Sequence, residues 1–127
     1  TVRGLHFQKK PKKQAKLVSV KQGSIFDVFV DIRKNSKSFG KYKTVKLKSL
    51  DSFLLYIPYG FAHGFCTLEK NTVVTYKISD FYSPRHEITI KYDDPTINIK
   101  WPKFLNSKQI SKKDKVGSNL SSVTSIL

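Results

Sequence analysis

The sequence predicts an all-β fold, an antiparallel sandwich or barrel, for a chain of 127 residues. Short apolar runs recur roughly every ten residues with turn-forming residues between them, a spacing typical of sandwiches and barrels. No apolar pattern with the helical period of about 3.6 residues continues for long. Hydrophobic residues form 39% of the chain and aromatic residues 13%, which is enough for the core of one domain.

The expected strands follow one another along most of the chain. The strand at residues 25–32 is the clearest, because Phe26, Val28, Val30 and Ile32 share one face of it. Asp27, Phe29 and Asp31 share the other face. Gly23 and the polar residues 35–40 are expected turns on either side. The remaining strands are expected at residues 1–7, 17–20, 43–47, 53–57, 73–78, 87–92 and 97–99.

The end of the chain carries the little helical signal that the sequence contains. We expect one short helix within residues 107–115. Residues 116–127 are rich in Ser, and we expect them to form a loosely held polar tail. The domain is therefore assigned to residues 1–115 and the tail to residues 116–127.

The charge is strongly positive but does not predict a specific nucleic-acid interface. Lys and Arg number 24 and Asp and Glu number 9, so the net charge is 24 − 9 = +15. Only Arg3, Arg33 and Arg85 are arginines, although bidentate recognition of phosphate and guanine favours arginine. The lysines are scattered, so we expect a solvated basic surface that attracts small anions and no specific nucleic-acid partner.

Cysteine and hydropathy exclude several other classes. Cys66 is the sole cysteine, so these residues cannot form an intrachain disulfide or a zinc site made of cysteines alone. No apolar run approaches the ~18 residues of a membrane-spanning helix, and no membrane partner is expected. These features predict a cytoplasmic protein.

Two histidines lie in motifs that suggest a site inside a barrel. The spacing Pro58-x-Gly60-x-x-His63 resembles the second motif of the cupin superfamily of small β-barrels. Metal-binding cupins carry a His-x-His pair in their first motif, but here Gln8 follows His6 at the second position. Transition-metal sites usually need three or four protein ligands, so we expect a barrel without metal.

A wider set of ordered blocks comprises residues 2–8, 14–18, 23–33, 38–40, 57–65, 75–77, 82–84, 93–95 and 99–102. Together these blocks resemble one family, the dTDP-4-dehydrorhamnose 3,5-epimerases. The resemblance implies a cupin-like jelly-roll barrel of antiparallel strands with a short C-terminal helical segment. It also implies a homodimer that needs no cofactor and inverts C3 and C5 of a dTDP-4-keto-6-deoxy sugar in dTDP-rhamnose synthesis.

The resemblance assigns roles to residues that composition alone could not single out. His6 matches the base that removes the proton next to the ketone, and Asp114 matches its carboxylate partner. Lys16 matches the cation near the C4 oxygen, and Tyr76 matches the acid on the opposite sugar face. The positions matching the substrate-binding pocket are Arg3 for a phosphate, Tyr82 for stacking on thymine, and Gln8 and His63 as further polar lining.

Family members carry an N-terminal segment before the Arg3-Gly4-Leu5-His6 motif that these residues do not include. The segment supplies early strands, some exchanged between subunits, and further nucleotide contacts. Two alternatives to the enzyme therefore stay open. One is a truncated, non-catalytic cupin that binds anionic ligands through its lysines. The other is a structural remnant that folds only with a partner strand or subunit.

Overall fold

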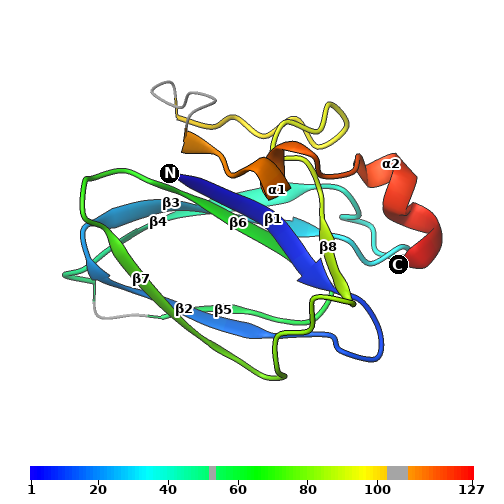
Figure 1. Cartoon of the computed structure of the whole chain (residues 1–127), viewed down its shortest axis with the longest axis horizontal. Coiled ribbons are helices and arrows are strands. Elements are labelled where there is room, and N and C mark those ends of the chain that lie inside the picture. Colours follow the sequence, from blue (N-terminus) through cyan, green and yellow to red (C-terminus); the bar gives the residue numbers. More distant parts are fainter. Residues whose placement is uncertain (52–53, 103–108) are drawn as a thin grey trace.

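The computed structural model, which describes residues 1–51, 54–102 and 109–127, folds the chain into two antiparallel sheets (Figure 1). The first sheet has the strand order β4-β3-β6-β1-β8, and the second has the order β5-β2-β7. The predicted all-β architecture is therefore confirmed. The strands are β1 (Val2–Gln8), β2 (Lys16–Gln22), β3 (Ser24–Asp31), β4 (Tyr42–Lys48), β5 (Leu55–Ile57), β6 (Phe61–Thr67), β7 (Val73–Ile78) and β8 (Glu87–Thr89).

Most strands fall where the apolar runs predicted them, with two differences. Strand β6 was not expected, because His63 and Gly64 interrupt its apolar pattern. The strand expected at residues 97–99 is wrong, since Ile97 lies in a turn and Asn98 has a φ of 55°. Ile97 and Ile99 are nevertheless buried, which explains their apolar character. Part of the strand expected at residues 53–57 lies outside the described residues.

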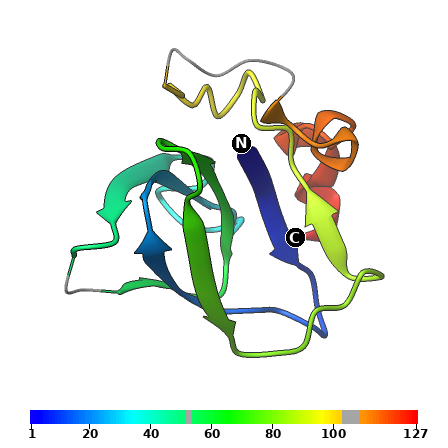
Figure 2. The ribbon, with the colours of Figure 1, turned by 60° about the vertical axis from the view of Figure 1, so that its left-hand side comes forward.

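The C-terminal residues belong to the core, so the expectation of a loosely held tail after residue 115 is wrong. Helix α1 (Lys112–Lys115) lies within the expected helical range, whose first residues, 107–108, lie outside the described ones. Helix α2 (Leu120–Val123) and a 3-10 turn (Thr124–Ile126) follow it. Leu120 and Val123 are buried, and the Leu120 N–H donates to Asp94 Oδ1 at 2.8 Å. In Figure 2 this segment lies beside β1 and β8, on the side away from β7.

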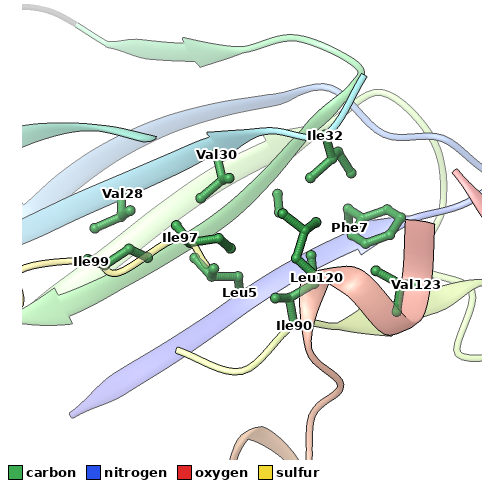
Figure 3. Packing of buried hydrophobic residues seen from close by; sticks show 11 residues of the cluster. Leu5, Phe7, Val28, Val30, Ile32, Ile90, Ile97, Ile99, Leu120 and Val123 are labelled. Carbon is green, nitrogen blue, oxygen red and sulfur yellow. The ribbon is translucent and has the colours of Figure 1, made fainter. Parts of the chain in front are cut away.

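Two apolar clusters occupy opposite faces of the five-stranded sheet. The first joins Val28, Val30 and Leu5 to side chains of the C-terminal half, as Figure 3 shows. The second fills the space between the two sheets and contains Val18 from β2 and Phe65 from β6. Side-chain alternation along β3 produces this division, as the sequence predicted. The inner face therefore receives the polar residues that β3 and β6 direct between the sheets.

Two glycines let β1 and β6 approach each other closely. A Cβ on Gly4 would lie 2.6 Å from the carbonyl oxygen of His63, and one on Gly64 would lie 2.7 Å from that of Arg3. The strand register also shifts between Arg3 and His6, so that Arg3 pairs with Phe65 and His6 pairs with His63. Cross-strand partners share a face, so His6 is directed into the space between the sheets.

Candidate functional site

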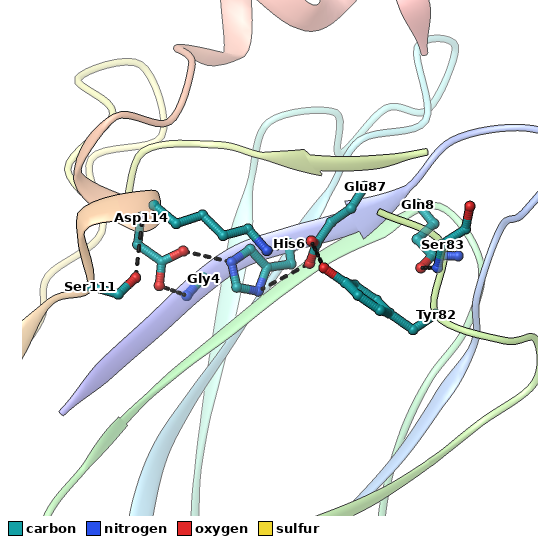
Figure 4. Close-up of polar contacts among 9 residues, drawn as sticks. Gly4, His6, Gln8, Tyr82, Ser83, Glu87, Ser111 and Asp114 are labelled. Atoms are coloured by element: carbon teal, nitrogen blue, oxygen red, sulfur yellow. Dashed lines mark hydrogen bonds and ion pairs between the residues drawn. The ribbon is translucent and has the colours of Figure 1, made fainter. Parts of the chain in front are cut away.

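A histidine and an aspartate from opposite ends of the chain form the centre of the site (Figure 4). His6 Nε2 lies 2.6 Å from Asp114 Oδ1, so β1 and α1 bring together the residues that the resemblance paired. The Gly4 N–H donates to Asp114 Oδ2 at 3.3 Å. Ser111 caps α1, because its hydroxyl accepts from the Asp114 N–H at 3.2 Å. The Asp114 carboxylate is thus positioned by its contacts with β1 and by the capped start of α1.

Burial and hydrogen bonding act in opposite directions on the Asp114 carboxyl. Burial alone would raise its pKa, but the hydrogen bond and charge of His6, together with the Gly4 and Ser111 contacts, outweigh burial and lower the pKa. The carboxylate is therefore ionised near neutral pH. An ionised partner requires Nε2 to carry the proton of this hydrogen bond, which leaves the lone pair of neutral His6 on Nδ1.

A second carboxylate, Glu87, lies on the other side of the imidazole. Glu87 Oε1 is 3.8 Å from His6 Nδ1, and Glu87 Oε2 accepts from the Tyr82 hydroxyl at 2.8 Å. Lys113 forms an ion pair with the same oxygen. Burial would raise the pKa of Glu87, but its contacts with Lys113 and Tyr82 lower it. Glu87 was not among the predicted site residues, since nothing in its local sequence distinguishes it. Its register opposite Gln8 on β1 brings it into the site.

The predicted cation and phenol lie on the opposite sheet. Lys16 on β2 has Val18 as its neighbour on the same face, and Tyr76 on β7 shares a face with Val74; both valines pack into the inter-sheet cluster. Lys16 Nζ lies 5.9 Å from the centre of the Tyr76 ring. Burial lowers the pKa of Lys16, while the charges of Glu87 and Asp27 raise it by less. Both side chains thus face the inter-sheet space that His6 enters.

A buried histidine–aspartate pair lies beneath the site. His63 Nε2 is 2.7 Å from Asp27 Oδ2, and both side chains are almost completely buried. Burial raises the pKa of Asp27 and lowers that of His63, although their mutual hydrogen bond opposes both shifts. Asp27 Oδ1 has no hydrogen-bond partner among the described residues. Asp27 was not among the predicted site residues, although an aspartate directed inward from an apolar strand was a usable signal.

The remaining predicted binding residues differ in how they are engaged. Gln8 is buried and holds the loop before β8: its amide donates to the Lys12 and Phe81 carbonyls at 2.7 and 3.2 Å, and its oxygen accepts from the Ser83 N–H at 2.8 Å. The structure therefore gives Gln8 a supporting position and leaves its amide N–H groups occupied. Tyr82, carried by this loop, is 55% exposed. Arg3 is exposed as well.

A cavity of about 330 Å³ lies outside this constellation, near the ends of β1 and β3. Its lining includes Phe7, Phe61 and the predicted binding residue Gln8, but none of the residues His6, Lys16, Tyr76 or Asp114. Within the described parts of the chain, no three His, Cys, Asp or Glu side chains are grouped to hold a metal ion. The described helices are all too short to cross a membrane.

Comparisons with known proteins point to one family. The family model described as dTDP-4-dehydrorhamnose 3,5-epimerase matches residues 1–122. A protein of that name from Sinorhizobium fredii is 46% identical over 114 residues, which are 90% of this chain and 58% of the relative. One from Methanothermobacter thermautotrophicus is 45% identical over 115 residues, 90% of this chain and 62% of the relative. The chain thus spans about three fifths of the length of these curated relatives.

Solved structures of such enzymes have the same fold. The crystal structure of dTDP-4-dehydrorhamnose 3,5-epimerase from Bacillus anthracis, with TDP and PPi bound, matches with a TM-score of 0.88 and 44% identity, covering 94% of this chain and 67% of that one. The Legionella pneumophila dTDP-6-deoxy-D-glucose-3,5-epimerase, in complex with dTDP-4-keto-L-rhamnose, matches with a TM-score of 0.87 and 43% identity over 94% of this chain and 63% of that one. The predicted jelly-roll fold is confirmed.

Proposed function

This chain belongs to the dTDP-4-dehydrorhamnose 3,5-epimerase family, and on that premise we propose that its site inverts C3 and C5 of a dTDP-4-keto-6-deoxy sugar. The observation that carries the proposal is the 2.6 Å contact between His6 Nε2 and Asp114 Oδ1 at the inter-sheet space. A base oriented by a buried carboxylate suits proton removal near neutral pH. The relatives' names favour this activity over a non-catalytic binding module.

The reaction consists of proton transfers next to a ketone. The hydrogens on C3 and C5 are both α to the C4 carbonyl, so removal of either one produces an enolate. His6 Nδ1 accepts the proton from carbon, while Nε2–H remains hydrogen-bonded to the Asp114 carboxylate. The carbon lone pair moves into the enolate, and its negative charge collects on the C4 oxygen. Asp114 then stabilises the imidazolium that has formed.

Lys16 and Tyr76 complete the reaction from the other sheet. The Lys16 ammonium offsets the negative charge that develops on the enolate oxygen in the transition state. The Tyr76 hydroxyl donates a proton to the opposite face of the same carbon, which inverts its configuration. The positions of Lys16 and Tyr76 support these two roles, because Lys16 Nζ lies over the Tyr76 ring on the sheet that faces His6.

The nucleotide is proposed to bind at the exposed rim of the site. Arg3 offers an exposed guanidinium for a phosphate, and the exposed ring of Tyr82 offers a stacking surface for thymine. The substrate complexes known for relatives support this class of ligand. A homodimer and a cytoplasmic location stay predictions from the sequence.

Exchange with heavy water tests the proposed chemistry. The chain is incubated in D₂O with dTDP-4-keto-6-deoxy-D-glucose, and deuterium at C3 and C5 is followed by NMR and mass spectrometry. We expect incorporation at both carbons with the parent chain and none with His6→Ala, because the variant lacks the proposed base. His86→Ala is the matched control, since His86 takes part in no proposed step and its side chain is hydrogen-bonded to Ser83.

Three results would count against the proposal. Equal exchange in the His6→Ala variant and the parent would remove His6 from its role. Exchange at one carbon alone would restrict the activity to a single epimerisation. No exchange by the parent, together with salt-sensitive binding of DNA of any sequence, would favour the anion-binding module.

A further inference from the structure

We infer that Glu87 is a positioning residue for His6: its carboxylate anchors Tyr82 and Lys113 and presents a second negative charge to the ring nitrogen that accepts the substrate proton. The inference relies on the proposed function for the identity of the substrate. The juxtaposition itself comes from β8, α1 and β1, which meet at this point (Figure 4).

The carboxylates of Asp114 and Glu87 contact the His6 imidazole at different distances. Asp114 forms a direct hydrogen bond to Nε2 at 2.6 Å, whereas Glu87 Oε1 stands 3.8 Å from Nδ1. A separation of 3.8 Å is beyond hydrogen-bond distance, so Glu87 leaves the Nδ1 lone pair free for the substrate. It is still close enough for a strong charge interaction once Nδ1 carries a proton. Glu87 thus favours the imidazolium without competing for the base in its resting form.

The orientation of Glu87 is fixed from its other oxygen. Oε2 accepts from the Tyr82 hydroxyl at 2.8 Å and pairs with the Lys113 ammonium, which leaves Oε1 directed at His6. The side chain is 11% exposed, so solvent screens its charge only weakly. Lys113 precedes Asp114 in α1, and the ion pair therefore also ties the helix that carries the first carboxylate to strand β8.

Other titratable groups surround the imidazole, but none of those described places a negative charge beside Nδ1. Asp114 faces Nε2 from α1, and His63 lies opposite His6 on the neighbouring strand β6. Lys16 on β2 and Lys113 on α1 are cationic and interact with Glu87 itself. Among the described residues, Glu87 is therefore the one anion that the structure places beside Nδ1.

Glu87→Gln tests the inference because it keeps the shape and removes the charge. With the dTDP-4-keto sugar as substrate, we expect kcat to fall about tenfold and KM to change less than threefold, since the lost charge acts on the imidazolium formed during reaction. Glu69→Gln is the matched control, because Glu69 is the other glutamate of the chain and contacts Ser24 outside the site. A mainly structural role would instead raise KM or lower the melting temperature.

A second measurement needs no turnover and so separates this inference from the proposed function. The ring signals of His6 are followed by NMR between pH 5 and 8 in the parent and in Glu87→Gln. We expect a smaller protonated fraction in the variant than in the parent at the same pH, because the negative charge beside Nδ1 is gone. Identical titration curves would overturn the inference, whether or not the chain is active.

Discussion

The burial of α2 gives a stability prediction that compares two leucines. Leu120 is 2% exposed and packs against Phe7, Ile90 and Val123, whereas Leu50 is 94% exposed. Leu→Ala in a packed core costs about 2–5 kcal/mol, through lost burial and the cavity left behind. The backbone hydrogen bond of residue 120 to Asp94 survives the change, so packing alone is tested. Leu50→Ala is expected to stay within about 0.5 kcal/mol of the parent.

Thermal and urea unfolding measure both variants. For a chain of this size about 4 °C of melting temperature corresponds to 1 kcal/mol, so Leu120→Ala should melt about 8–20 °C below the parent. Leu50→Ala should melt within about 2 °C of it. If Leu120→Ala also melted within 2 °C, the C-terminal segment would not be part of the cooperative core, and the packing argument would be refuted.

Three further predictions concern the site and the strands. Asp114→Asn should slow deuterium exchange about 10–100-fold, the cost of a charge-assisted hydrogen bond, while Asp51→Asn leaves the rate unchanged. The Arg33 guanidinium lowers the pKa of Asp31 far below its unfolded value of about 3.9, so its stabilisation is complete above that pH and declines below it. Urea unfolding of Asp31→Asn should therefore show a stability loss at pH 7 that narrows at pH 3; a constant gap would contradict this. Gly64→Ala should lower the melting temperature, because its Cβ would lie 2.7 Å from the Arg3 carbonyl oxygen; an unchanged value would refute that contact.

Much of the fold could be predicted because the relevant information is local. Alternation along residues 25–32 correctly assigned Val28 and Val30 to one apolar layer and Phe29 to the other. Strand β6 escaped prediction, since Gly64 is a poor strand former when judged alone. Its place in the sheet follows from the close approach of Gly4 on β1, which no local pattern encodes. The burial of Leu120 and Val123 was likewise not predicted, because the stretch around them is rich in Ser.

The sequence by itself determined the strand-rich class, the absence of a disulfide within these residues, and the motif that carries His6. Only the tertiary structure decided which groups meet that imidazole. Asp114 lies 108 positions away along the chain, and Glu87 enters the site through the pairing of β8 with β1. The physical reason is that side-chain alternation depends on neighbours two residues apart, whereas a contact across the sheets depends on the path of the whole chain.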